Sequence, residues 1–246
     1  MVECDENRCF CLNGVQNIGA VLMQKEIVRD WSNNDNHAFY DNMTLDFFVA
    51  GAKRSGLANG EDVKQIKNLI LHAESILEVG AGYGRVLKHI LELDYKGSLD
   101  AVEYEKQYYD FCFERYSDKV ALYHADILQW QAPKKYDLIL SMWSSFTEFC
   151  EQEQRKLFRV FAGMLQPGGK LVVELLNPSA ADKDRMVVDG DYCQFTYERP
   201  GGYLFFPAYS NLVEYAADDF SGFDIIQYKV NETVDRNICI FSRASF

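Results

Sequence analysis

Short apolar runs alternate along the chain with segments whose apolar residues recur at helical spacing. Residues 76–79 form one such run, and Val86, Leu87, Ile90 and Leu91 then share one face of a helix. Further strands are expected at 98–103, 119–124, 136–141, 171–176, 224–230 and 237–242, and further helices at 61–72, 107–116, 151–165 and 211–219. This alternation predicts an α/β fold, with helices on both faces of a mostly parallel sheet.

The last two predicted strands are the exception to the parallel arrangement. The loop between 224–230 and 237–242 is too short to hold a crossover helix. Two strands joined in this way pair antiparallel. We therefore expect a seven-stranded sheet that is mostly parallel and whose last strand is antiparallel.

Two segments lie outside the alternation. Residues 37–52 are aromatic and apolar at a spacing that predicts one helix, and 15–28 are compatible with another. Later in the chain, strands at 192–199 and 203–206 flank Pro200-Gly201-Gly202, which is a hairpin signal. The expected organisation is an N-terminal helical cap over residues 1–58 and one α/β domain over 59–246, with a β-hairpin insertion at about 182–210.

A glycine-rich loop follows the first strand and reads Glu78-x-Gly80-x-Gly82-x-Gly84, with Arg85 next. Glycine permits unusual backbone angles and lets a ligand lie directly against the main chain. At the carboxyl end of a strand, facing a helix N-terminus, such a loop is typical of a nucleotide-type site. Arg85 stands where the dinucleotide fingerprint needs glycine, and the Gly-Lys-Ser/Thr ending of a P-loop is absent. A plain glycine-rich turn is the alternative.

The loop resembles the first motif of the class I S-adenosyl-L-methionine-dependent methyltransferases, which have a Rossmann-like fold. In that family it carries the amino-acid end of the cofactor, and S-adenosyl-L-homocysteine is the product. A Leu-x-Pro-Gly-Gly sequence before a strand, here at residues 165–169, and an antiparallel last strand are also common in the family. The resemblance covers about residues 60–246 and implies methyl transfer by in-line displacement.

The resemblance also implies roles for two carboxylates. Glu103 ends the second strand, 19 residues past Gly84, where the family has an acidic residue that accepts hydrogen bonds from the ribose hydroxyls. Asp126 followed by an apolar residue resembles the adenine site, with capping of the next turn as the alternative. Asp100 and Glu105 are expected to be surface charges. The cofactor-binding residues are then Glu78, Gly80, Ala81, Gly82, Gly84, Arg85, Glu103, Tyr104, Asp126, Ile127, Ser141 and Met142.

The acceptor is expected beside residues 141–147, which in the family border the methyl group. Tyr40, Trp143 and Phe146 would line its pocket, with the N-terminal cap as a lid; simple packing on the core is the alternative. The aromatic residues of the insertion serve the pocket, the core or a homodimer contact, and the sequence leaves these open. Tyr40, His37 and Glu174 are the candidates for a general base, and none is favoured.

Charge narrows the range of partners. The net charge is −12, from 37 acidic and 25 basic residues, and no Lys/Arg cluster is present. Nucleic acid is therefore disfavoured as a methyl acceptor. No apolar run reaches the length of a membrane span, and the acidic, polar residues 1–8 do not resemble a secretory signal. We expect no membrane contact and a cytoplasmic location.

The seven cysteines do not predict a metal site. Cys4, Cys9 and Cys11 crowd the N-terminus without a Cys-x-x-Cys pair, so free thiols are the better interpretation. Cys112 and Cys239, like Cys150, sit among apolar neighbours and are expected to pack in the core.

The expected function is methyl transfer from S-adenosyl-L-methionine to a small molecule. A protein methyltransferase is the first alternative, because an acidic surface attracts a basic tail. A cofactor-binding protein without catalysis, acting as a regulatory or scaffolding module, is the second. A pyridine-nucleotide oxidoreductase is a more distant interpretation.

Overall fold

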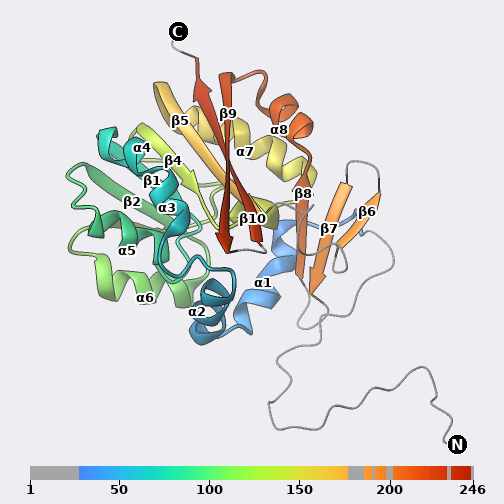
Figure 1. Ribbon diagram of the computed structural model, residues 1–246. Helices are drawn as coiled ribbons and strands as arrows, with labels where there is room; N and C mark the ends of the chain where they lie inside the picture. Colours follow the sequence, from blue (N-terminus) through green and yellow to red (C-terminus); the bar gives the residue numbers. More distant parts are fainter. Residues whose placement is uncertain (1–27, 177–185, 190–191, 198–201, 232–233, 245–246) are drawn as a thin grey trace, which may run out of the picture.

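The computed structural model describes residues 28–176, 186–189, 192–197, 202–231 and 234–244. A seven-stranded sheet forms its centre, in the order β3-β2-β1-β4-β5-β10-β9 (Figure 1). The strands are β1 (Ser75–Val79), β2 (Ser98–Glu103), β3 (Ala121–His124), β4 (Tyr136–Ser141), β5 (Leu165–Leu176), β9 (Phe220–Asn231) and β10 (Val234–Arg243). The pairs among β1 to β5 are parallel, whereas β10 is antiparallel to both β5 and β9. The predicted topology is therefore confirmed.

Helices cover both faces of this sheet, as the alternating pattern predicts. One face carries α3 (Glu61–Gln65), α4 (Lys67–His72), α5 (Arg85–Glu92) and α6 (Lys106–Tyr116), and the other carries α7 (Glu151–Met164) and α8 (Tyr209–Ala216) (Figure 1). Neighbouring strand residues enter opposite cores: Ile76 packs with the first group and Leu77 with the second, and both are fully buried. Burying side chains of this size stabilises the fold by about 1.5–3 kcal/mol each.

Aromatic side chains dominate the core beneath α7. Phe158 packs edge-on against Phe146, Phe220 and Phe241. Phe158 and Phe146 are completely buried. Of the cysteines expected in the core, Cys112 and Cys239 are buried and Cys150 is half-buried.

Two predicted helices are each broken in two. Residues 37–52 are divided between α1 (Asn33–Asp41) and α2 (Leu45–Arg54), because the Thr44 side chain accepts a hydrogen bond from the Phe47 amide and starts a new helix. Residues 61–72 are divided at Ile66, whose backbone angles are not helical, into α3 and α4. Apolar spacing alone did not reveal either break.

The insertion forms a small antiparallel sheet of β6 (Met186–Asp189), β7 (Tyr192–Tyr197) and β8 (Gly202–Pro207), which stands beside the main sheet (Figure 1). The β7–β8 pair confirms the predicted hairpin, although its turn lies outside the described residues. The predicted helix at 15–28 lies almost wholly outside them, as do Cys4, Cys9 and Cys11. The boundary between cap and domain near residue 58 stays a prediction.

The Asn36 side chain of α1 forms hydrogen bonds to the main chain of β8 in the small sheet. The Asn36 amide donates to the Tyr203 carbonyl at 2.9 Å, and its oxygen accepts from the Tyr203 amide at 2.7 Å. The same Asn36 nitrogen also donates to the Glu148 carbonyl at 2.8 Å. Asn36 is 2% exposed, so these bonds are shielded from water. The cap, the insertion and the segment after β4 are therefore joined at one point.

Candidate active site

A cavity of about 520 Å³ lies at the carboxyl ends of the central strands. Its floor comes from the glycine loop after β1, the end of β2 and the segments after β3 and β4. Its other walls come from α1, α2, α6 and β8. Ligands of open α/β sheets bind at this end of the strands.

Gly80, Gly82 and Gly84 of the loop all adopt positive φ, but their surroundings differ. A side chain on Gly82 would enter open space, with nothing within 4 Å, whereas one on Gly84 would meet the Tyr116 ring at 2.5 Å. Gly80 lies against Ser145, whose Oγ a side chain would approach to 3.1 Å. Gly80 and Gly82 line the cavity and Gly84 does not; Gly84 begins α5 and allows its close approach to α6.

Glu78 is buried beneath this loop and lines the cavity. Its Oε2 has no hydrogen-bond partner among the described residues. Burial raises the pKa of Glu78 well above its ordinary value, and the nearby Arg85 guanidinium opposes this rise. A buried acceptor without a donor is rare in proteins and marks a place where a ligand group can bind.

Glu103 connects the end of β2 to the glycine loop. Its Oε2 accepts from the Gly82 amide at 2.6 Å, and its Oε1 accepts from the Glu105 amide at 2.8 Å. Burial raises its pKa to about 7, against the lowering effect of these backbone bonds. Each oxygen keeps a second lone pair with which it can accept from a ligand hydroxyl.

Tyr104 and Glu105, which follow β2, are held in place by His37 of α1. His37 Nδ1 lies 2.9 Å from Glu105 Oε1, and the His37 ring stacks on Tyr104 with 3.8 Å between centroids. Glu105 is 8% exposed and Asp100 is 2% exposed, with Asp100 bound to Lys134 and to the Tyr136 hydroxyl. The expectation that both acids are surface charges was therefore wrong.

Asp126 and Ile127 follow β3 and both line the cavity. Asp126 Oδ1 accepts from the Leu128 amide at 2.9 Å, and Oδ2 accepts from the Gln129 side chain at 2.7 Å. The carboxylate therefore caps the following turn, and in this position it still borders the cavity. Ile127 is buried and offers an apolar surface beside it.

The turn after β4 holds Trp143 in a strained conformation. Trp143 and Ser144 have φ of 51° and 63°, which side-chain-bearing residues rarely adopt. The Ser144 amide donates to the Glu174 carbonyl at 3.0 Å. The Ser144 Oγ accepts from the Leu176 amide at 3.2 Å and from the Arg236 guanidinium at 3.3 Å. These bonds fix the turn, and Trp143 lines the cavity.

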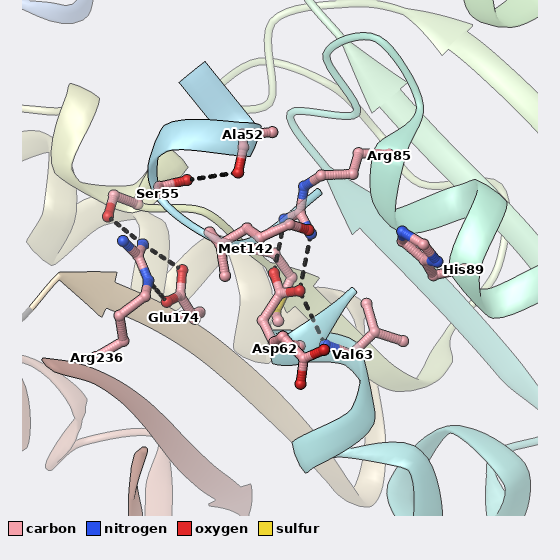
Figure 2. A network of polar contacts seen from close by, with 12 residues as sticks. Ala52, Ser55, Asp62, Val63, Arg85, His89, Met142, Glu174 and Arg236 are labelled. Atoms are coloured by element: carbon pink, nitrogen blue, oxygen red, sulfur yellow. Dashed lines mark hydrogen bonds and ion pairs between the residues drawn. The ribbon is translucent and has the colours of Figure 1, made fainter. Parts of the chain in front are cut away.

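Two buried ion pairs, shown in Figure 2, adjoin this turn. Arg85 donates to both oxygens of Asp62, at 2.8 and 2.6 Å, and its guanidinium lies 5.5 Å from the Trp143 ring centroid. Arg236 binds both oxygens of Glu174. All four charged side chains are at most 4% exposed. Arg85 and Arg236 border the cavity, and the carboxylates that neutralise them do not line it.

Glu148 ends a short 3-10 helix, η1 (Ser145–Glu148), and also lines the cavity. The Tyr40 hydroxyl donates to its Oε1. Burial raises the pKa of Glu148 to about 8, and the bond from Tyr40 opposes the rise. The Tyr40 ring stacks on Phe48 at 5.6 Å, so α1 and α2 together place this hydroxyl.

Solved structures share this architecture at low sequence identity. An S-adenosylmethionine-dependent methyltransferase from Clostridium acetobutylicum ATCC 824 is 14% identical, with 86% of this chain and 98% of that chain covered and a TM-score of 0.59. CalS10, an amino pentose methyltransferase from Micromonospora echinaspora, is 13% identical, with 82% and 99% covered and a TM-score of 0.59. The glycopeptide N-methyltransferase MtfA is 20% identical, with 73% and 88% covered and a TM-score of 0.57. At these identities the likeness shows a common fold.

The sequence itself matches a family over its central part. Residues 76–169, from β1 into β5, match the model of a family described as a methyltransferase domain. This part of the chain is therefore similar to methyltransferase domains, and the fold is one that S-adenosylmethionine-dependent methyltransferases share. Among curated proteins, no sequence matches this chain significantly.

Most of the sequence-predicted site residues line the cavity, and four do not. Phe146 is fully buried in the core against Phe158, because η1 turns it away from the cavity. Ser141 is buried within β4, and Gly84 faces α6. Glu174, a candidate base, is held by Arg236 and by the Tyr228 hydroxyl at 2.9 Å. The pocket role of Phe146 and the base role of Glu174 were therefore wrong.

The sequence reasoning missed Glu148 and the aromatic residues Phe48 and Tyr108, all of which line the cavity. The single available signal was the position of Glu148 after the fourth strand, in the segment expected near the methyl group. Within the described ranges, no group of three or more His, Cys, Asp or Glu side chains is placed to hold a metal ion. None of the helices there is long and apolar enough to cross a membrane.

Proposed function

We propose that this protein transfers the methyl group of S-adenosyl-L-methionine to a small-molecule acceptor inside the cavity at the ends of β1, β2 and β4. The observation that carries the proposal is the open space over Gly82, directly beside the Glu103 carboxylate. Backbone without a side chain next to a buried carboxylate suits a nucleoside-type ligand.

The residues present fit the cofactor. Gly80, Gly82 and the unpartnered Oε2 of Glu78 would hold its amino-acid end, where an ammonium group can donate to that oxygen. Glu103 would accept from the ribose hydroxyls. Asp126 would accept from the adenine amino group while Ile127 packs on the ring. Ala81, Tyr104 and Met142, which also line the cavity, would complete the contact.

A sulfonium is already a strong electrophile, so the bound cofactor supplies an activated methyl group. The task of the chain is to align the acceptor with it and to exclude water. Trp143 and Tyr40 would border the acceptor, and aromatic faces hold a cation without covalent chemistry. Helices and strands that line the cavity, α1 and β8 among them, would keep bulk water away from the reacting atoms.

A small acceptor is supported by the size and closure of the site. The cavity of about 520 Å³ falls in the range of small-molecule sites, about 300–1,000 Å³. Two proteins of the same fold are described as an amino pentose methyltransferase and a glycopeptide N-methyltransferase. A basic protein tail is the other candidate acceptor, because the net charge of the chain is −12.

Titration calorimetry with S-adenosyl-L-homocysteine and with NADH tests the cofactor assignment. Binding of S-adenosyl-L-homocysteine alone is expected, and binding of NADH alone would overturn it. Transfer of a labelled methyl group is then compared between a small-molecule extract and a proteome. Label in the extract supports the proposal, label in protein supports the protein methyltransferase, and no label in either supports a non-catalytic role.

A further inference from the structure

Glu148 presents a fixed carboxylate with an unused oxygen. Its main-chain carbonyl accepts from the Asn33 and Asn36 side chains at 3.1 and 2.8 Å, so its backbone is held between α1 and α7. Its Oε1 accepts from the Tyr40 hydroxyl, whereas Oε2 receives no hydrogen bond within the described part of the chain. The carboxylate lines the cavity. One oxygen is therefore oriented and the other can bind a ligand.

The charges around the cavity favour a cationic occupant. The carboxylates that line it are Glu78, Glu103, Glu105, Asp126 and Glu148. Two of the lining arginines, Arg85 and Arg236, are already neutralised by Asp62 and Glu174, and the third, Arg54, is exposed on α2. His37 faces Glu105. The cofactor carries one net positive charge, so a second cation is favoured wherever more than one of the remaining carboxyl groups is ionised.

Four aromatic rings in contact with one another line the cavity, and one of them, Tyr40, binds Glu148. The Phe48 ring stacks on Tyr40 at 5.6 Å and meets Tyr108 and Trp143 edge-on at 5.3 and 6.3 Å between centroids. All four side chains line the cavity. Aromatic faces attract an ammonium group within about 6 Å by roughly 0.5–2 kcal/mol each. A carboxylate set among such rings is a site for an amine and a poor site for an anion.

We propose that the methyl acceptor is an amine, and that the Glu148 carboxylate binds its ammonium group and takes its proton before methyl transfer. The proposal rests on the function proposed above and names the substrate class of the same cavity. Tyr40 is a positioning residue, since it holds Oε1 and leaves Oε2 for the ammonium.

The steps balance without a further reactant. The ammonium N–H bond breaks and its proton passes to Glu148, which leaves a neutral amine with a free lone pair. That lone pair forms the N–C bond to the methyl group as the C–S bond breaks, and the electron pair of that bond stays on sulfur. The products are the N-methylammonium ion and S-adenosyl-L-homocysteine, and Glu148 returns its proton to water.

The surroundings of Glu148 suit proton transfer near neutral pH. Burial, with the neighbouring Glu103 and Glu105 at the end of β2, raises its pKa to about 8, and Tyr40 from α1 lowers it. Tyr108 from α6 also faces it, and Glu148 helps to raise the pKa of that phenol. An incoming ammonium would lower the pKa of Glu148 again, because an opposite charge favours the carboxylate.

The test uses the full chain and three variants. Glu148→Gln keeps the shape and the Tyr40 contact but cannot take a proton, and Tyr40→Phe keeps the carboxylate but frees Oε1. Glu114→Gln, at an exposed site on α6, is the matched control. Each protein is titrated with S-adenosyl-L-homocysteine, and then incubated with methyl-labelled S-adenosyl-L-methionine and a small-molecule extract separated by charge into cationic, neutral and anionic pools.

We expect label only in the cationic pool, on nitrogen, with a rate that falls as pH drops below about 8. Glu148→Gln should lower kcat/KM for this acceptor by about 10²–10⁴-fold and abolish that pH dependence. Tyr40→Phe should move the acidic limb to higher pH. The control should match the wild type, and all three variants should bind S-adenosyl-L-homocysteine as the wild type does.

Other results separate the two proposals. Label on oxygen, sulfur or carbon, or in the anionic pool, overturns the amine while the methyltransferase function stands. An unchanged rate and pH profile in Glu148→Gln overturns the role of that carboxylate. Failure of the wild type to bind S-adenosyl-L-homocysteine overturns the proposed function itself, and binding without any transfer overturns both.

Discussion

Asn36 and Tyr203 exchange a pair of hydrogen bonds that imitates a pairing between strands. The carboxamide oxygen accepts from the Tyr203 amide at 2.7 Å, and the nitrogen donates to the Tyr203 carbonyl at 2.9 Å. A side chain of α1 thereby occupies the place of a neighbouring strand at the edge of β8. Because 167 residues separate the two partners, the contact fixes one wall of the cavity against another.

Asn36→Ala should therefore loosen this junction. It removes three hydrogen bonds and leaves the Tyr203 amide and carbonyl without these partners, while the Glu148 carbonyl keeps the bond from Asn33. The free energy of unfolding should therefore fall by about 3 kcal/mol. Asn42→Ala is the control, because that side chain is exposed and bonds only to the Ala38 carbonyl within its own helix. Urea unfolding measures both variants. Equal stability of the two would contradict the role given to Asn36.

Gly82→Ala and Gly84→Ala should differ in which property they damage. A methyl group on Gly82 enters open cavity space, so we expect at least about a tenfold loss of S-adenosyl-L-homocysteine affinity and a stability cost of about 1 kcal/mol for the positive φ. A methyl group on Gly84 meets Tyr116 at 2.5 Å and should destabilise the fold more. Calorimetry and thermal unfolding separate the effects. Undiminished binding by folded Gly82→Ala would contradict the cofactor assignment.

The half-buried carboxyl of Glu148 should make stability depend on pH. Its pKa is raised from the ordinary 4.5 to about 8, so the folded chain keeps this proton at a pH where the unfolded chain has lost it. The stabilising contribution is complete below pH about 4.5 and is lost as pH rises through 8. Glu148→Gln stays neutral throughout. It should exceed the wild type in unfolding free energy at pH 9, by at least about 1 kcal/mol, and match it near pH 4.5.

Urea unfolding at both pH values checks this expectation, with Glu114→Gln as the control. A Glu148→Gln variant that is less stable than the wild type at pH 9 would show that the carboxylate is structural. A more stable but inactive variant would instead separate its chemical role from folding, because strained or desolvated functional groups commonly lower stability.

The Glu174–Arg236 pair should be among the most sensitive sites of the fold. Glu174→Ala leaves the Arg236 guanidinium buried without a counter-charge, which costs about 3–5 kcal/mol. It also removes the acceptor of the Tyr228 hydroxyl. Glu92→Ala, which removes an exposed pair with Lys88 on α5, should change little. Denaturant unfolding compares them, and a similar small loss in both would show that water reaches Arg236.

The spacing of apolar residues predicted the sheet and most helices. Each of these elements buries one face, and a buried face leaves a regular apolar pattern in the sequence. The glycine loop was readable because its backbone conformation excludes other residues. Thr44 and Ile66 break predicted helices that remain apolar on both sides, so no change of pattern marks the breaks. Such breaks depend on tertiary packing and single capping bonds.

The acceptor side of the site was harder to predict for a different reason. Glu148 meets Tyr40 across 108 residues, and Glu174 meets Arg236 across 62. Neither partner can be identified from local sequence. Phe146 follows Trp143 by one turn, and only the 3-10 geometry of η1 decides that it enters the core. The sequence therefore predicted the side of the cavity formed by the glycine loop and the ends of β2 and β3 better than the side formed by α1, α2 and the turn after β4.

This unequal construction has an evolutionary consequence. One unbroken stretch, residues 78–127, supplies most of the surface proposed for the donor, while α1, α2 and β8 come from both ends of the chain to complete the cavity wall. Mutations, insertions or recombination in those outer pieces can alter which molecule is accepted and leave the donor surface untouched. On the proposed function, a lineage with this architecture can diversify its substrates quickly, because each new specificity starts from a protein that already binds the methyl donor.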